Sequence, residues 1–189
     1  MVDLLPHNLR SDARDNRERI LDAARAVFAA DGLDVPMREI ARRAGVGPAT
    51  LYRRFPTKEL LVTAAFTDQM RACYSIVDEG LADPDPWHGF VLVVEKLCDL
   101  QARDAGFTAA FTTAYPHAID FTADRERAMR SIAKLIRRAQ EAGQVRSDVG
   151  LDDVVLVLMA NGGIRAASPS ARVAASRRFA ALALRGFRA

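Results

Sequence analysis

The segment from Met37 to Phe55 constrains the fold most, because it contains two short helical patterns joined by a turn of a few residues. Its first half places apolar residues at the i, i+3, i+4 and i+7 positions of a helix: Met37, Ile40, Ala41 and Ala44. Gly45 supplies the left-handed backbone that a tight turn requires. Pro48 then stands where the first turn of a second helix tolerates proline. The segment therefore predicts a helix-turn-helix.

The side chains of this segment divide between an inner and an outer face. Ala41 is small enough for the two helices to cross closely, and Val46 is expected to join the turn to the core. Leu51 and Phe55 form the inward stripe of the second helix at i, i+4. The residues left facing outward are small, hydroxyl, aromatic and cationic: Pro48, Ala49, Thr50, Tyr52, Arg53 and Arg54. Such groups suit base edges and phosphates in a DNA major groove, although an ordinary pair of helices with a surface arginine cluster would show the same pattern.

The charge distribution strengthens the DNA-binding interpretation more than the total charge does. The formal net charge is only +3, but residues 38–58 hold six basic side chains and a single acidic one, Glu39. A local cationic patch on a near-neutral body is typical of a module that contacts DNA. A solvated charged face is the alternative explanation.

The rest of the chain is also predicted to be helical, because the alternating β-branched pattern of strands is missing. The sequence predicts Thr57 and Asp85 as N-caps of two later helices, and residues 1–13 as a loosely ordered arm. Helices are expected over residues 15–30, 37–44, 48–54, 58–80, 86–103, 107–114, 123–142, 151–160 and 170–187. The predicted fold class is all-α.

Residues 17–61 resemble the TetR family of bacterial transcriptional regulators. The matching positions are Arg17, Ile20, Leu21, Ala23, Ala24, Phe28, Gly32, Ile40, Ala41, Ala44, Gly45, Val46, Thr50, Leu51, Tyr52, Phe55, Lys58 and Leu61. The resemblance implies a three-helix DNA-binding domain over residues 1–60 and a larger helical domain over residues 61–189 that dimerises and binds a ligand. It also implies a ligand-responsive regulator, expected to be a repressor, whose homodimer binds a palindromic double-stranded DNA operator and is released by a small-molecule effector.

The resemblance further implies roles for individual residues at the DNA. Tyr52 and Lys58 match phosphate contacts, Thr50 matches a contact to backbone or base, and Arg38 matches a groove or phosphate contact. The variable recognition positions of the family correspond to Pro48, Ala49, Arg53 and Arg54. One departure is that Pro36 precedes Met37 where the family often has a hydroxyl cap, so the phosphate contact of that hydroxyl is not expected here.

Two features of the C-terminal half predict a ligand pocket and a dimer interface. Aromatic and apolar residues that could line a cavity are Trp87, Phe90, Cys98, Phe107, Phe111, Tyr115, His117, Phe121 and Met159, although any of them could be ordinary core. The helix over residues 151–160 is apolar nearly all round, which implies burial on more than one side. Phe179, Leu182, Ala183 and Gly186 form a second stripe. The last two helices are therefore expected to form the dimer interface, with an intramolecular core as the alternative.

Other classes of protein find little support in the sequence. It holds no nucleophile elbow, phosphate loop or metal-ligand spacing, so we expect no enzyme, cofactor or metal site. The two cysteines, Cys73 and Cys98, are expected to be buried thiols. No apolar run reaches the ~20 residues of a membrane helix, and a cytoplasmic location is expected. A DNA-binding architectural protein without a ligand is the remaining alternative, and a ligand that changes the affinity for DNA would exclude it.

Overall fold

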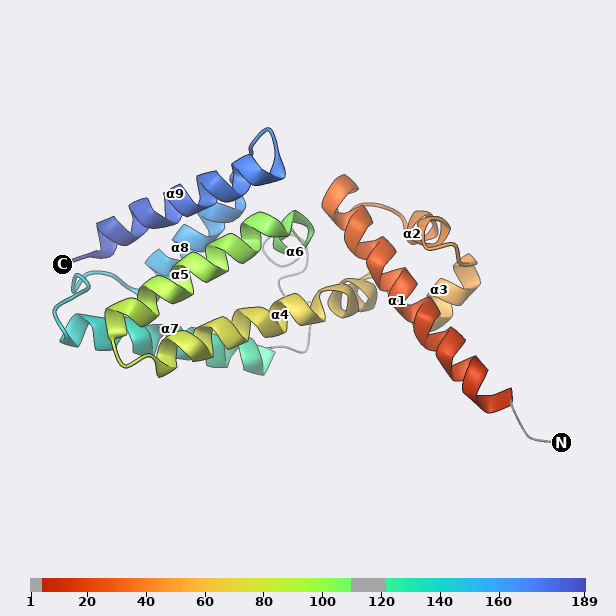
Figure 1. The fold of residues 1–189 in the computed structure, drawn as a ribbon, viewed down its shortest axis with the longest axis horizontal. Helices are drawn as coiled ribbons and strands as arrows, with labels where there is room; N and C mark the ends of the chain where they lie inside the picture. The colour runs from red at the N-terminus through yellow and green to blue at the C-terminus, as the bar shows by residue number, and fades with distance from the viewer. Residues whose placement is uncertain (1–4, 110–121) are drawn as a thin grey trace.

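The computed structural model describes residues 5–109 and 122–189, and this part of the chain contains helices and no strand (Figure 1). The predicted all-α fold is confirmed. The helices are α1 (Leu5–Asp31), α2 (Met37–Arg43), α3 (Pro48–Arg54), α4 (Lys58–Ala82), α5 (Pro86–Arg103), α6 (Ala105–Ala109), α7 (Thr122–Glu141), α8 (Leu151–Gly162) and α9 (Pro169–Phe187). None of these helices is long and apolar enough to cross a membrane.

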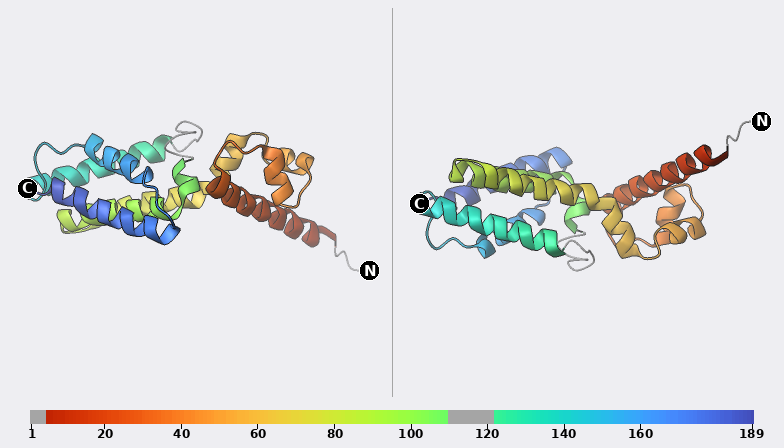
Figure 2. Two further views of the ribbon diagram at one scale, coloured as in Figure 1. Left: turned by 90° about the horizontal axis from the view of Figure 1, so that it is seen from above. Right: turned by 90° about the horizontal axis from the view of Figure 1, so that it is seen from below.

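The molecule is elongated, with α1–α3 at one end, α5 and α7–α9 at the other, and α4 spanning both (Figure 2). We call α1–α3 the head and α5–α9 the body. Helices α5 and α9 of the body lie side by side with α4 in one layer, and α7 and α8 lie behind it (Figures 1 and 2). The central helix is α5, which packs against α4, α7, α8 and α9.

The buried residues form two hydrophobic clusters that meet along α4. The head cluster includes Leu61 and Phe66 from the first turns of α4, so these turns are packed as part of the head. The body cluster begins at Tyr74, and Met70 and Cys73 touch both clusters. The predicted domain boundary after residue 60 stays a prediction, and the packing changes from one cluster to the other more than two turns later along α4.

Helix α1 corrects the prediction of an N-terminal arm, because the helix begins at Leu5 and not near residue 15. Pro6 lies in the first turn, where backbone N–H groups have no partner within the helix, so the proline costs the helix no hydrogen bond. No glycine or proline follows until Gly32, whose positive φ of 80° ends the helix. A polar composition therefore did not prevent helix formation here.

The predicted caps of α4 and α5 are confirmed. The hydroxyl of Thr57 accepts a hydrogen bond from the backbone N–H of Leu60 at 3.3 Å. The carboxylate of Asp85 accepts from the N–H groups of Trp87 and His88 at 3.0 and 3.4 Å. Each cap satisfies a donor that the first helical turn would otherwise leave unpaired. The short helix expected over residues 107–114 is α6, which ends at Ala109 within the described residues.

A polar network that the sequence analysis missed holds the body together where α5, α8 and α9 meet. Asn161 and Ser176 are buried, with 4% and 0% of their surface exposed. The Asn161 amide donates to the Cys98 carbonyl at 3.1 Å and to the Gln101 side chain at 2.9 Å. The Ser176 hydroxyl lies 3.0 Å from the same Cys98 carbonyl and 2.7 Å from the Asn161 side-chain oxygen. These bonds fix the end of α5 that lies nearest the head.

Candidate nucleic-acid interface

The turn between α2 and α3 has the geometry that the sequence predicted. Gly45 has a φ of 65°, a left-handed conformation that favours glycine. The N–H of Val46 donates to the carbonyl of Ala41 at 3.0 Å, and that of Gly45 donates to Arg42 at 3.2 Å. This pair of bonds satisfies the last carbonyls of α2 and fixes the direction in which the chain leaves it.

Arg19 of α1 adds a second cap to the same turn. Its guanidinium donates to the carbonyls of Ala44 and Gly45 at 2.9 and 3.3 Å, and to the Asn16 side chain at 3.1 Å. The turn is therefore tied to α1 by hydrogen bonds as well as by apolar packing. The sequence analysis missed Arg19, because an arginine before a buried isoleucine gives no sign of a contact 25 residues later.

Helix α3 separates its residues as predicted. Leu51 is fully buried and Phe55, which caps the helix, is 5% exposed, so the predicted inward stripe is confirmed. Tyr52 leaves 49% of its surface exposed. The other outward positions are also exposed, except Thr50, which is half-buried: Pro48, Ala49, Arg53 and Arg54. Helix α3 itself lies in the end of the molecule that is remote from α9 (Figure 1).

The cationic patch is smaller than the count of basic residues suggested. Glu39 accepts from Arg42 through both carboxylate oxygens, at 2.7 and 2.8 Å, and from Arg43 at 2.9 Å. These hydrogen bonds lower the pKa of Glu39 to about 2, so its charge is present at neutral pH. Arg43 also pairs with Asp31 of α1 at 2.7 Å. Arg42 and Arg43 therefore have acidic partners within the head.

Arg38 lies in the first turn of α2, and Lys58 is the first residue of α4. Arg38 is exposed and Lys58 is half-buried. Partial burial lowers the pKa of the Lys58 ammonium, and the carboxylates of Asp34 and Glu59 oppose that shift. Pro36 precedes α2 without a side-chain cap, which confirms that no hydroxyl stands at this position. Cationic, hydroxyl and aromatic side chains are thus accessible on the outward positions of α3, which is the kind of surface that DNA recognition requires.

Within residues 5–109 and 122–189, the predicted pocket residues do not lie together. Trp87 and Phe90 pack at the start of α5, where Phe90 contacts Phe187 with ring centroids 5.8 Å apart. Phe107 belongs to the head cluster and lies 5.9 Å from Phe66. Residues 90–103 of α5 lie between these two groups and span about 20 Å. Residues that lie close together in this apolar part of the sequence therefore do not line one common pocket.

The remaining predicted pocket residues have separate positions. Cys98 is buried in the body cluster, and burial raises the pKa of its thiol to about 12, as it does for Cys73. Met159 points outward with 59% of its surface exposed, because Val154 and Asn161 define the inner side of α8. Four further predictions lie outside the described residues: Phe111, Tyr115, His117 and Phe121.

Comparison with known proteins finds two family models along the chain. Residues 20–65 match the model described as bacterial regulatory proteins, tetR family. Residues 85–189 match the C-terminal domain of SbtR-like transcriptional regulators. The first match covers the helix-turn-helix and the start of α4, and the second covers the body.

Individual relatives agree with the family models. The HTH-type transcriptional repressor KstR of Mycobacterium tuberculosis is 34% identical over 149 residues, which cover 77% of this chain and 68% of that protein. A TetR transcriptional regulator from Streptomyces coelicolor is 31% identical, with a TM-score of 0.58 over 91% of this chain and 98% of that one. A TetR regulatory protein from Mycobacterium vanbaalenii is 34% identical, with a TM-score of 0.54 over 96% and 99%.

Proposed function

Because this chain belongs to the TetR family of bacterial transcriptional regulators, we propose that it is a ligand-responsive repressor that binds a palindromic operator as a homodimer. One observation carries the DNA-binding part of the proposal. The outward face of α3 presents Thr50, Tyr52 and Arg53 at the free end of the head, while Leu51 and Phe55 anchor the same helix in the core. A recognition helix needs both properties, because its side chains must be accessible and its direction fixed.

We assign the DNA contacts from the resemblance of the head to the TetR family. Tyr52 and Lys58 contact phosphates, and Arg38 contacts the groove or a phosphate. Thr50 contacts backbone or base, and the recognition positions that read sequence are Pro48, Ala49, Arg53 and Arg54. Arg42 and Arg43 contribute less, because Glu39 and Asp31 already neutralise them.

The dimer part of the proposal rests on the apolar surface of α8 and α9. Leu156, Met159 and Leu182 are among the large hydrophobic side chains that the chain leaves exposed, at 64%, 59% and 50%. All three lie on the last two helices, and we infer from this that they belong to one interaction surface. A symmetric pair of chains covers both copies of the same patch at once, and it presents two heads to two half-sites of a palindrome.

The effector part of the proposal concerns α4. Its first turns belong to the head cluster and its later turns to the body cluster. A ligand that binds one arrangement of the body better than another shifts the head through this helix. The repressor assignment is supported by the relative KstR, whose printed name is that of a transcriptional repressor.

Selection of DNA by the full-length protein from a random double-stranded library tests the proposal. The enriched sequences should contain an inverted repeat, and the protein should bind them as a dimer. A matched pair of variants supplies the control. Arg53→Ala should change the enriched bases, whereas Arg137→Ala on α7 removes the same charge away from both the head and the proposed dimer interface and should leave them unchanged. Enrichment of a sequence without two-fold symmetry, or of no sequence, would contradict the proposal.

A further inference from the structure

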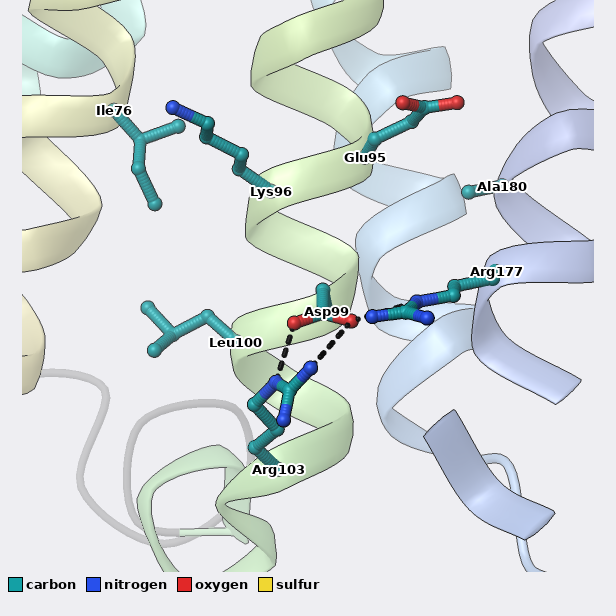
Figure 3. Close-up of a pocket in the computed structure, with 8 residues that line it drawn as sticks. All are labelled: Ile76, Glu95, Lys96, Asp99, Leu100, Arg103, Arg177 and Ala180. Carbon is teal, nitrogen blue, oxygen red and sulfur yellow. Dashed lines mark hydrogen bonds and ion pairs between the residues drawn. The ribbon is translucent and has the colours of Figure 1, made fainter. Parts of the chain in front are cut away.

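The outward face of α5 carries a pocket that the proposed function does not use. Its volume is about 440 Å³, within the range of small-molecule sites. It lies between α4 and α9 on the side of α5 away from α8 (Figure 3). The residues that line it are Ile76 of α4, Arg177 and Ala180 of α9, and Glu95, Lys96, Asp99, Leu100 and Arg103 of α5. We propose that this pocket binds compact amphipathic carboxylates.

Two arginines share one carboxylate at one end of the pocket. The Asp99 carboxylate accepts from Arg103 Nε at 2.5 Å and from Arg177 Nε at 3.0 Å. These hydrogen bonds lower the pKa of Asp99, with the bond from Arg103 contributing most, so Asp99 is ionised at neutral pH. Two guanidinium groups against a single carboxylate leave one positive charge in excess at this end. A second carboxylate, supplied by a ligand, would balance it.

The two guanidiniums also keep donors available for a ligand. Each guanidinium has five N–H groups, and Asp99 occupies only part of each set. Arg103 and Arg177 expose 56% and 64% of their side chains, so a ligand reaches them without opening the fold. Arginine forks bind carboxylates through paired hydrogen bonds. The Arg103 and Arg177 side chains converge on Asp99 from α5 and α9, as Figure 3 shows.

The α4 side of the pocket favours the apolar part of a ligand. Ile76 and Leu100 lie on the α4 side of the pocket (Figure 3). The Lys96 ammonium is paired with Glu79 of α4, with both distances 2.8 Å, whereas Glu95 points to the α9 side of α5 (Figure 3). Because Glu79 already neutralises Lys96, this side offers an anion no net positive charge, whereas the two arginines do, and this difference sets the orientation of the ligand. Residues 96–103 span about 10 Å along α5, which is close to the extended length of octanoate.

The pocket is also fixed by ion pairs on both sides. Lys96 and Glu79 join α5 to α4, and Asp99 and Arg177 join α5 to α9. The described residues of the pocket thus hold their positions before a ligand arrives, which reduces the entropy lost on binding. The pocket is separate from the buried side of α5, where Leu97 and Cys98 belong to the body cluster.

Titration of the full-length protein with sodium octanoate, followed by the amide NMR signals of α5 and α9, tests the inference without DNA. Octanoate should shift signals near Asp99 and Arg177, and octanamide, which lacks the charge, should not. Arg103→Gln and Arg177→Gln should each weaken octanoate binding about twofold to fivefold, as expected for exposed charge pairs. The matched control is Arg178→Gln, which makes the same change on the neighbouring residue outside the pocket lining and should leave the affinity unchanged.

Asp99→Asn gives a result of opposite sign. Removing the resident carboxylate leaves both guanidiniums unneutralised, so octanoate should bind about twofold to fivefold more tightly. A general loss of structure cannot produce tighter binding, which separates the proposed role of Asp99 from a purely structural one. Equal binding of octanamide and octanoate, unchanged affinity in Arg177→Gln, or weaker affinity in Asp99→Asn would each overturn the inference. Because no readout involves DNA, failure here is distinct from failure of the proposed repressor function.

Discussion

Replacing Leu156 with glutamate tests the dimer proposal most directly. Leu156 has 64% of its surface exposed, so dimerisation can still bury most of its side chain. Full burial of a leucine is worth 1.5–3 kcal/mol, which leaves about 1–2 kcal/mol for this copy and about 2–4 kcal/mol for the two copies of a symmetric interface. The dimer dissociation constant should therefore rise by between about 30-fold and 700-fold, and two facing carboxylates would raise it further.

Sedimentation equilibrium of the wild type and the variant at micromolar concentration measures this effect. Leu60→Glu is the matched control, because Leu60 is another exposed leucine, at 51%, but lies on α4 in the head cluster region. Leu182→Glu should act like Leu156→Glu. Leu158 is unsuitable, because it is half-buried against the body cluster and its replacement would disturb the fold. A wild-type monomer, or a Leu156→Glu protein as dimeric as the Leu60→Glu control, would refute the reasoning.

Three further predictions concern the head and the body. Lys58→Ala should lower the slope of log K for DNA against log salt concentration by about one, since one phosphate contact is lost, and an unchanged slope would remove Lys58 from the phosphate contacts. Arg19→Met should lower the unfolding free energy, measured by denaturation, by about 0.5–1.5 kcal/mol, and it should weaken operator binding, measured by fluorescence anisotropy. Unchanged affinity for the operator would mean that the turn does not need this cap. Ser176→Ala should lower the unfolding free energy by about 1–3 kcal/mol, because Asn161 loses a hydrogen-bond partner, and adding Asn161→Leu should recover part of this loss. A double variant that is less stable than Ser176→Ala would contradict this account of the network.

The features that the sequence predicted correctly have causes within a few residues of the chain. Thr57 and Asp85 cap helices through N–H groups two or three residues later. The φ of Gly45 follows from the turn in which it stands. The same locality explains why Leu51 was placed inside α3 and Tyr52 outside, since both assignments depend only on helical periodicity.

The features that the sequence did not predict depend on distant partners. Arg19 bonds to a carbonyl 25 residues away, and Ser176 bonds to one 78 residues away. The compensation of Arg43 by Asp31 likewise needs the packing of α1 on α2. The orientation of Met159 depends on which side of an almost wholly apolar helix faces α5, and composition alone cannot decide that. These misses share one reason, because each requires the tertiary arrangement of helices.

The packing between head and body limits how an effector could act. The head contacts the body directly through α6, in addition to the connection through α4. Gly106 of α6 lies so close to α1 that a Cβ at this position would stand 2.9 Å from the backbone nitrogen of Ala29. On α4, the Arg25 guanidinium of α1 donates to the Ala65 carbonyl at 2.9 Å. Since α1 is held at both places, tilting α4 alone would break the contact at Gly106. An effector that moves α3 must therefore shift α4 and α6 together, and its differential affinity must exceed the cost of any contact that is lost.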